Sequence, residues 1–254
     1  MAYIVYDGSF EGFLSVVFHC YQYKITPSDI CKDANFQNIL FADKETIATD
    51  ELRAARVWKA IQKKLHKSNK QLLFKAFLSE ETGIELMLYR FIRRLLDSNF
   101  SIETDYGDTN VLQLKKLERK VMQEAARILQ FVRFQETKDG IFFAPIESAY
   151  DVLPFVIRHF KDRFADQQWL IYDLKRDYGF FYDLKKAEEV VLSEKSFSTT
   201  DGKVDSNFLE EDEVAYQTLW KDYFNSINIK ARKNLKLQRQ HMPRRYWKFL
   251  PEKQ

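Results

Sequence analysis

The first residues of the chain pass from an apolar run into a helical pattern across one turn. Residues 2–6 (AYIVY) form a short apolar run that is typical of a buried strand. Asp7-Gly8 is a turn signal, and Ser9 can cap a following helix. Apolar residues at three- and four-residue spacing then predict a helix with one buried face. These are Phe10, Phe13, Leu14, Val17, Phe18 and Tyr21.

Helical spacing dominates the chain up to residue 130. Residues 51–67 are predicted to form a helix with Val57, Trp58, Ile61 and Leu65 inward and a basic outer face. Residues 72–78, the segment that follows Ser79 and residues 112–130 continue the helical pattern. Residues 26–49 are expected to be loop, with a short strand at 39–41. Residues 1–130 are therefore predicted to be mainly helical.

The pattern changes to strands at about Phe131. Residues 131–145 predict a hairpin around Asp139-Gly140, because this pair provides the positive φ angles of tight hairpin turns. Residues 169–184 predict a second hairpin, and residues 151–164 a helix between the two. Two hairpins with a helix between them indicate an antiparallel sheet, so the predicted fold class is α+β.

The last quarter of the chain is predicted to return to helix. Residues 185–193 predict a short helix, and the small polar residues of 196–207 an exposed loop. From Glu210 the helical pattern returns, and its expected core positions are Val214, Leu219, Tyr223 and Phe224. We expect one domain over 1–254, with a mainly helical region at 1–130, a sheet-containing region at 131–195 and a helical basic arm at 208–254.

Composition indicates a folded protein of the cytoplasm. Of the 254 residues, 45% are hydrophobic and only 7 are Gly and 5 Pro, so the bulk of the chain is not expected to be disordered. Cys20 and Cys31 have neither metal-type nor redox-type spacing, which fits a reducing compartment. The start lacks a basic leader region, and no apolar run approaches the roughly 18 residues of a membrane span. We expect no metal and no cofactor.

Charge is distributed unevenly between the C-terminal segment and the rest. Residues 223–251 carry eight Lys or Arg and no acidic residue, whereas the remaining residues carry 32 basic and 37 acidic side chains. A basic arm on an acidic body is expected to bind a polyanion or an acidic protein surface. The candidate nucleic-acid-binding residues are Lys230, Arg232, Lys233, Lys236, Arg239, His241, Arg244, Arg245, Tyr246 and Trp247.

Three interpretations of this arm remain open. Arginine forks match phosphate oxygens and aromatic rings stack on unpaired bases, so the arm can bind nucleic acid. Its cations can instead dock on an acidic protein. It can also be purely structural, with Tyr246, Trp247 and Phe249 anchoring the terminus. If residues 226–241 are helical, Ile227, Ala231 and Leu235 are expected to pack that helix down, and Pro243 ends it.

A catalytic interpretation rests on one histidine and two carboxylates. His159 lies on the predicted helix just before the second hairpin, which carries Asp173 and Asp183. A general base paired with a carboxylate can be built from such residues, although their spacing does not require them to meet. Phosphate-binding glycine loops, zinc-binding His-Glu-x-x-His motifs and nucleophile elbows are absent from the sequence.

Several strings resemble a known bacterial family. The string from His241 to Glu252 (HMPRRYWKFLPE) is similar to the C-terminus of the family known as probable DNA metabolism proteins. Residues 6–13 (YDGSFEGF), Arg163-Phe164, residues 169–173 (WLIYD), Arg176 and Tyr178-Gly179 resemble the same family. The resemblance implies work on DNA beside a radical-SAM protein, since members are encoded next to one and related domains are fused to uracil-DNA-glycosylase-like domains.

The leading hypothesis is therefore a DNA-binding accessory protein in repair or base modification, with a radical-SAM partner. The chain lacks the three-cysteine cluster motif of such enzymes, so that chemistry would belong to the partner. One alternative is an enzyme that acts on a nucleotide or a nucleic-acid base, with its active site near His159 and the hairpin at residues 169–183. The other is a protein-interaction module without nucleic-acid contact.

Overall fold

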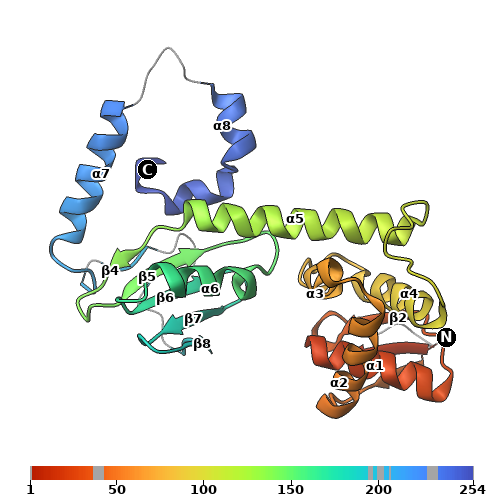
Figure 1. The fold of residues 1–254 in the computed structure, drawn as a ribbon. Coiled ribbons are helices and arrows are strands. Elements are labelled where there is room, and N and C mark those ends of the chain that lie inside the picture. Colours follow the sequence, from red (N-terminus) through yellow and green to blue (C-terminus); the bar gives the residue numbers. More distant parts are fainter. Residues whose placement is uncertain are drawn as a thin grey trace. The chain divides into compact units, whose positions relative to one another are not determined.

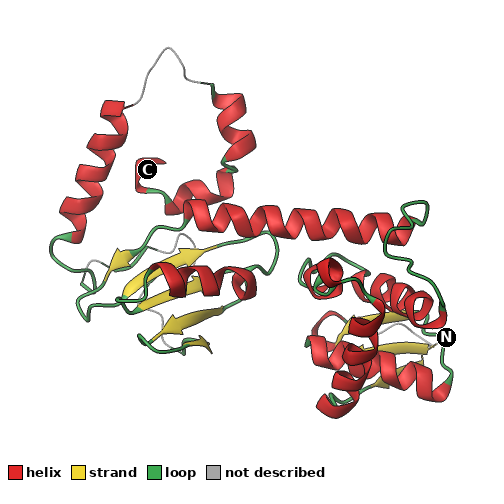
Figure 2. Cartoon of the chain, in the orientation of Figure 1, coloured by secondary structure: helices red, strands yellow, loops and turns green. Residues whose placement is uncertain are grey.

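The computed structural model describes residues 2–36, 43–193, 197–198, 203–205, 207–227 and 234–253, and the chain divides into two compact units. The first unit is Met1–Met122 and the second is Gln123–Gln254. Both contain helices and strands (Figure 2), so the predicted α+β class is confirmed. The single domain expected for the whole chain stays a prediction, because two compact units are compatible with one domain or with two.

The first unit contains a three-stranded parallel sheet. Strand β1 (Ala2–Tyr6) lies between β2 (Asp29–Lys32) and β3 (Asp43–Thr46) and pairs with both in parallel. The strand predicted at 2–6 is confirmed, whereas the loop expected over 26–49 contains two further strands. Each is four residues long, too short for a reliable alternation of polar and apolar positions. The strand expected at 39–41 lies outside the described residues.

Two helices of the first unit begin at side-chain caps, of which the sequence predicted the one at Ser9. The Ser9 hydroxyl accepts a hydrogen bond from Gly12 N at 2.9 Å, and the Asp50 carboxylate accepts one from Arg53 N at 3.0 Å. Inward residues such as Phe13 are fully buried. The helical elements are α1 (Phe10–Tyr23), η1 (Asp33–Asn35), α2 (Glu51–Lys64), η2 (Lys67–Asn69), α3 (Leu72–Phe77), α4 (Ile84–Asp97) and the first part of α5 (Thr109–Phe131).

The second unit is built on a five-stranded sheet of order β4-β5-β6-β7-β8. Both predicted hairpins are present, because β4 pairs antiparallel with β5 and β6 antiparallel with β7. The strands are β4 (Gln135–Glu136), β5 (Phe142–Ile146), β6 (Trp169–Asp173), β7 (Tyr178–Tyr182) and β8 (Ala187–Val190). The prediction of a wholly antiparallel sheet is wrong, because β5 and β6 pair in parallel. Helix α6 (Leu153–Arg163) provides the crossover that a parallel pair requires and lies across one face of the sheet (Figure 1).

Two further predictions for this unit need correction. The short helix predicted at 185–193 is wrong, since these residues contain β8, whose pairing with β7 overrides local propensity. The exposed loop predicted at 196–207 is wrong for two of its described residues. The ring of Phe197 stacks on Phe143 at 4.7 Å between centroids, and Val204 is buried in the same cluster as Tyr172.

Close backbone contact fixes one residue of the second hairpin as glycine. Gly179 in β7 pairs opposite Tyr172, and a Cβ at this position would lie 2.4 Å from the carbonyl oxygen of Ile171.

The C-terminal part of the second unit is helical. Its elements are α7 (Glu213–Ile227), α8 (Leu235–His241), η4 (Arg244–Phe249) and η5 (Pro251–Lys253).

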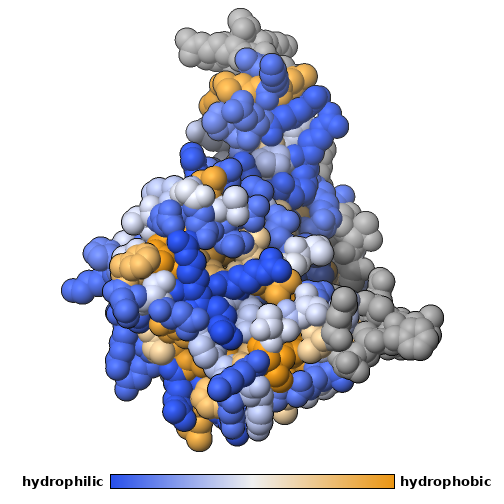
Figure 3. All heavy atoms as spheres, turned by 90° about the vertical axis from the view of Figure 1, so that its right-hand side faces the viewer, coloured by the Kyte–Doolittle hydropathy of each residue, from blue (hydrophilic) through white to orange (hydrophobic). Residues whose placement is uncertain are grey.

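One face of the surface is mainly polar. Over the face seen in Figure 3, hydrophilic side chains predominate and hydrophobic ones form scattered patches. None of the helices within the described ranges is both long enough and apolar enough to cross a membrane.

Candidate functional site

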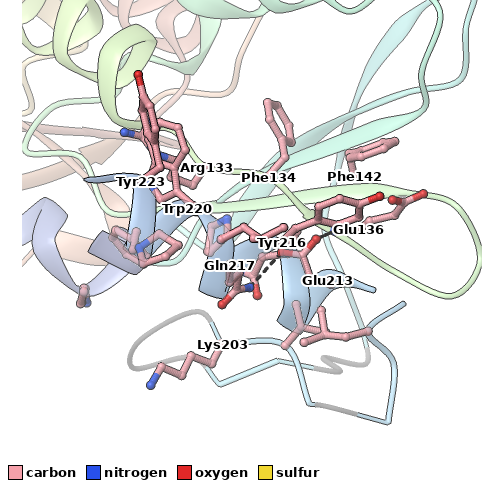
Figure 4. A pocket seen from close by; sticks show the side chains of 18 residues that line it. Arg133, Phe134, Glu136, Phe142, Lys203, Glu213, Tyr216, Gln217, Trp220 and Tyr223 are labelled. Atoms are coloured by element: carbon pink, nitrogen blue, oxygen red, sulfur yellow. Dashed lines mark hydrogen bonds between the residues drawn. The ribbon is translucent and has the colours of Figure 1, made fainter. Parts of the chain in front are cut away.

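A groove of about 860 Å³ opens in the second unit between α7, the β4–β5 hairpin and the C-terminal helices η4 and η5 (Figure 4). This volume falls within the range of small-molecule sites. Six of the 18 lining residues are aromatic, namely Phe134, Phe142, Tyr216, Trp220, Tyr223 and Phe249. The charged lining residues are Arg133, Lys203, Lys248, Glu136 and Glu213. The groove therefore offers ring faces for stacking together with charges of both signs.

Helix α7 brings its rings to the groove through helical spacing. Tyr216, Trp220 and Tyr223 follow one another at four and three residues and so lie on one face. The side chains of Tyr216 and Tyr223 are 61% and 55% exposed, and that of Trp220 is 40% exposed. The prediction that Tyr223 is a core position is therefore wrong, as it is for Val214 and Leu219, which are exposed as well. The stripe borders an open groove, and each of its three rings is at least 40% exposed.

The first turn of α7 is fixed to the sheet edge by a buried carboxylate. Glu213 Oε2 accepts a hydrogen bond from Glu136 N at 3.1 Å, and Glu213 Oε1 accepts one from Gln217 Nε2 at 2.9 Å. The Glu213 side chain is thereby used structurally. Its contacts hold α7 against β4 at one end of the groove.

A second contact ties α7 to the end of the chain. Glu252 Oε1 pairs with Arg133 Nη2 at 2.9 Å, and Glu252 Oε2 accepts a hydrogen bond from the Trp220 indole at 3.0 Å. The Arg133 guanidinium lies over the Trp220 ring, 5.7 Å from its centroid. Burial alone would raise the pKa of Glu252, but hydrogen bonds from its own backbone N–H and the indole, with the charge of Arg133, lower it. Trp220 is thus held in place at the groove wall.

Arg245 anchors the C-terminal segment through a buried ion pair. Its Nε donates to Glu124 Oε1 at 3.1 Å and its Nη2 donates to Glu124 Oε2, while the Glu124 side chain is only 1% exposed. Ala149 N also donates to Glu124, at 2.9 Å. Burial would raise the pKa of Glu124, but the hydrogen bonds from Ala149 N, Tyr246 and Arg245 lower it. Arg245 is therefore a structural anchor whose charge is already compensated.

The other residues of η4 divide between packing and exposure. Tyr246 is buried against Phe131, with ring centroids 5.3 Å apart, and burial followed by the Glu124 hydrogen bond raises its pKa. Trp247 is half-buried and donates its indole N–H to Met242 O at 3.1 Å. Arg244 is exposed, with its guanidinium 5.9 Å from the centroid of the Trp247 ring. Lys248 pairs with Glu147. Of the two adjacent arginines, Arg244 is exposed and Arg245 is half-buried and paired.

The part of the basic arm that lies on α8 is exposed. Lys236, Arg239 and His241 are all exposed, and no residue of α8 is buried. The prediction that Ile227 and Leu235 pack the arm helix down is wrong, because their side chains are 56% and 45% exposed. Lys230, Arg232, Lys233 and Ala231 lie outside the described residues.

The three candidate catalytic residues are placed in separate environments. His159 is exposed on α6 and makes an edge contact with the ring of Phe160. Asp173 is fully buried and pairs with Arg176 Nη1 at 2.7 Å. Asp183 accepts hydrogen bonds from Lys185 N at 2.9 Å and Lys186 N at 2.8 Å, and these turn contacts lower its pKa.

Both carboxylates thus stabilise the turns that follow their strands. Within the described ranges, no hydrogen bond joins either of them to His159. Those ranges also contain no group of three His, Cys, Asp or Glu side chains able to hold a metal ion.

Sequence reasoning missed the groove itself. Of its lining, Tyr216, Trp220 and Phe142 carried no functional prediction, and Tyr223 was expected in the core. In the sequence, the groove is indicated by the spacing that places three aromatic residues of α7 on one helix face. A helix buried in the core shows the same pattern, so this spacing alone does not predict an open groove.

Comparisons with known proteins give a family without an assigned activity. A family model described as a domain of unknown function, DUF4130, matches residues 82–252, which is more than half of the chain. No curated protein matches the chain. Among solved structures, a chain titled "pGpG-specific phosphodiesterase - PggH from Vibrio cholrae" is similar at 11% sequence identity and a TM-score of 0.31, covering 89% of this chain and 99% of that chain. A TM-score this low carries no argument about fold or function.

Proposed function

Since this chain belongs to the DUF4130 family, a domain of unknown function, we propose from its geometry that the second unit binds single-stranded nucleic acid. The bases would stack on the rings of the groove, and the backbone would follow the exposed cations of the C-terminal arm. The observation that carries the proposal is the row of exposed rings on α7, Tyr216, Trp220 and Tyr223, in a groove of about 860 Å³.

Stacking supplies the affinity in this proposal. Each base stacked on an aromatic side chain contributes on the order of 1–3 kcal/mol of binding free energy, whichever base it is. Trp220 is suited to this role, because its contacts with Glu252 and Arg133 fix the ring before a ligand arrives. A ring that is already ordered loses little conformational entropy on binding.

Unpaired bases fit the groove better than a duplex does. In a duplex the faces of the bases are stacked on one another, and proteins read only the base edges in the grooves. Rings that line a concave surface can reach base faces only where the strand is single or a base is turned out of the helix.

Charge supports an anionic ligand beside the groove. Lys236 and Arg239 on α8 and Arg244 on η4 are exposed, and residues 223–251 contain no acidic side chain. Such cations contact phosphates without sequence preference and make the affinity depend on salt. Arg245 is not among them, because Glu124 already compensates its charge.

The resemblance of residues 241–252 to DNA metabolism proteins makes DNA the first nucleic acid to test. We propose that any reaction on a bound base is carried out by a partner, and the resemblance points to a radical-SAM protein for that role. The chain would then hold the strand while the partner acts.

Fluorescence anisotropy with a labelled single-stranded DNA tests the proposal. Tyr216→Ala and Tyr223→Ala should each weaken binding by roughly 5- to 160-fold, the equivalent of one lost stacking contact of about 1–3 kcal/mol. The matched control is Tyr106→Ala, which removes a similarly exposed tyrosine from the first unit and should leave the affinity unchanged. Equal affinities for the wild type and both groove variants would rule out stacking in the groove.

One observation favours a second function, a protein-docking surface on α7. Leu219 and Ile227 are 63% and 56% exposed, and aliphatic side chains do not stack on bases as rings do. An exposed apolar stripe on a helix is typical of helix docking. Ile227→Ser would separate the two functions, since Ile227 does not line the groove and its loss should spare DNA binding and weaken binding to a partner protein.

A further inference from the structure

We propose that the first unit carries a second nucleic-acid-binding surface, a basic stripe on α2 that holds the phosphate backbone of a duplex. The stripe consists of Arg56, Lys59 and Lys63 on α2, and Lys67 and Lys70 continue it beyond the helix. Residues 52–79 contain eight Lys or Arg and no acidic residue. This segment is as basic as the C-terminal arm and belongs to a different unit.

The fold of α2 directs the stripe to solvent. Ala54, Val57 and Ile61 are buried and pack the helix into the unit. The stripe residues on α2 lie at three- and four-residue intervals on the opposite side, and all are exposed. At a rise of about 1.5 Å per residue, neighbouring cations are about 4.5–6 Å apart along the helix axis. This spacing is comparable with one to two phosphate steps of a DNA strand, at about 3.4 Å each.

The cations of the stripe are available to a ligand. Other basic residues of the segment are engaged: Arg53 pairs with Asp50 at 3.0 Å, and Lys64 donates to Ser98 O at 2.5 Å. For Arg56, Lys59 and Lys63, in contrast, no ion pair with a described carboxylate is present. Among the described residues, the contact found for the Arg56 guanidinium is with the ring of Phe18, 5.4 Å from its centroid. The stripe therefore keeps its positive charge at the surface.

Phosphates of a nucleic acid fit this surface better than a membrane does. Helices that bind bilayers place large apolar residues beside their basic face. On α2 the only large apolar side chain that is exposed, among the described residues, is Leu52 at the start of the helix. Leu52 lies one turn before Arg56 on the same face, so the stripe has a single apolar side chain, at one end. A row of cations with so little apolar surface is the footprint expected for backbone contacts.

The stripe does not depend on the groove proposed above. Backbone contacts need no unpaired base, so a duplex can bind to α2 even if no strand enters the groove. Conversely, stacking in the groove can occur without the stripe. The two sites are therefore separable by choosing the DNA form and the variant.

The test measures the affinity of the full-length chain for a short DNA duplex over a range of salt concentrations. The variant Arg56→Gln/Lys59→Gln/Lys63→Gln removes three cations from the stripe. Its control, Lys116→Gln/Arg119→Gln/Lys120→Gln, removes one arginine and two lysines from an exposed face of α5 in the same unit. Circular dichroism checks that both variants are folded.

Each neutralised phosphate contact contributes about 0.9 to the slope of log affinity against log salt. The stripe variant should therefore lower the magnitude of this slope by about 2.7 and weaken duplex binding, while the control retains the wild-type slope. An unchanged slope in the stripe variant, or equal losses in both variants, would overturn the inference. So would unchanged duplex binding together with lost binding to phosphatidylserine vesicles, because the stripe would then be a membrane surface.

Discussion

Replacing Arg245 by methionine is expected to destabilise the second unit strongly. Both nitrogens on one edge of its guanidinium bind the two oxygens of Glu124, whose side chain is 1% exposed. Arg245→Met would leave a buried carboxylate with less compensation. Removing one partner of a buried pair costs about 3–5 kcal/mol in unfolding free energy.

The structure places this case at or just below the lower limit of that range. The Arg245 side chain is 32% exposed, so water can partly replace it. Glu124 also keeps the hydrogen bond from Ala149 N at 2.9 Å and the ion pair with Arg127 at 3.3 Å. We therefore expect a loss of about 2–3 kcal/mol for Arg245→Met. Arg245→Lys should lose less, because lysine keeps the charge but cannot form the two-pronged contact.

Urea unfolding followed by tryptophan fluorescence measures this loss. Trp169, Trp220 and Trp247, three of the four tryptophans, lie in the second unit and report on it. The midpoint of Arg245→Met should fall by about 1 M urea or more. In the double variant with Glu124→Gln, the total loss should be smaller than the sum of the single losses by about 1 kcal/mol or more. A loss below about 1 kcal/mol for Arg245→Met, or strict additivity with Glu124→Gln, would refute the anchor.

Three further outcomes follow from the same geometry. The pKa values of Glu124 and Glu252 are lowered in the folded state, so the stabilisation from both carboxylates is complete above their unfolded pKa of about 4.3 and is lost as pH falls through the folded pKa. As the pH falls below ~4.3, the stability of Glu124→Gln, followed by circular dichroism, should therefore decrease less steeply than that of the wild type. Identical acid transitions of the variant and the wild type would count against this. Trp220→Phe keeps a ring but loses the hydrogen bond to Glu252, so it should retain most single-stranded DNA affinity, within about 5-fold, whereas Trp220→Ala should not; equal affinities of the two variants would contradict a stacking role. Gly179→Ala should lower the melting temperature, because its Cβ would overlap the Ile171 carbonyl oxygen, at a cost of about 1–3 kcal/mol, and an unchanged melting temperature would show that the strand can shift.

Local sequence patterns were sufficient for elements whose signals lie within a few residues. The cap at Ser9, the helix that follows it and the Asp139-Gly140 hairpin depend only on neighbouring side chains, and all are present. The parallel pairing of β5 with β6 depends instead on the path of the chain through α6, which no local pattern encodes. The strand β8 likewise exists because β7 offers it an edge. Such pairings are set by tertiary structure.

The candidate site was harder to predict than the fold. Spacing showed which residues of α7 share a face, but it could not show that this face borders an open groove. Nor could sequence distinguish Arg244 from Arg245, since the partner that anchors Arg245 lies 121 residues away along the chain. Two adjacent arginines of the same string thus have different roles. Only the three-dimensional arrangement separates a cation that binds the protein from one that faces solvent.

Photo-crosslinking can decide whether unpaired bases enter the groove. A single-stranded DNA that carries iodouracil is bound to the full-length chain and irradiated, and the crosslinked peptides are identified by mass spectrometry. We expect crosslinks at Tyr216, Trp220 or Tyr223, the exposed rings of α7. Crosslinks confined to peptides outside residues 213–227 and 244–253, while the DNA remains bound, would contradict nucleic-acid binding in the groove.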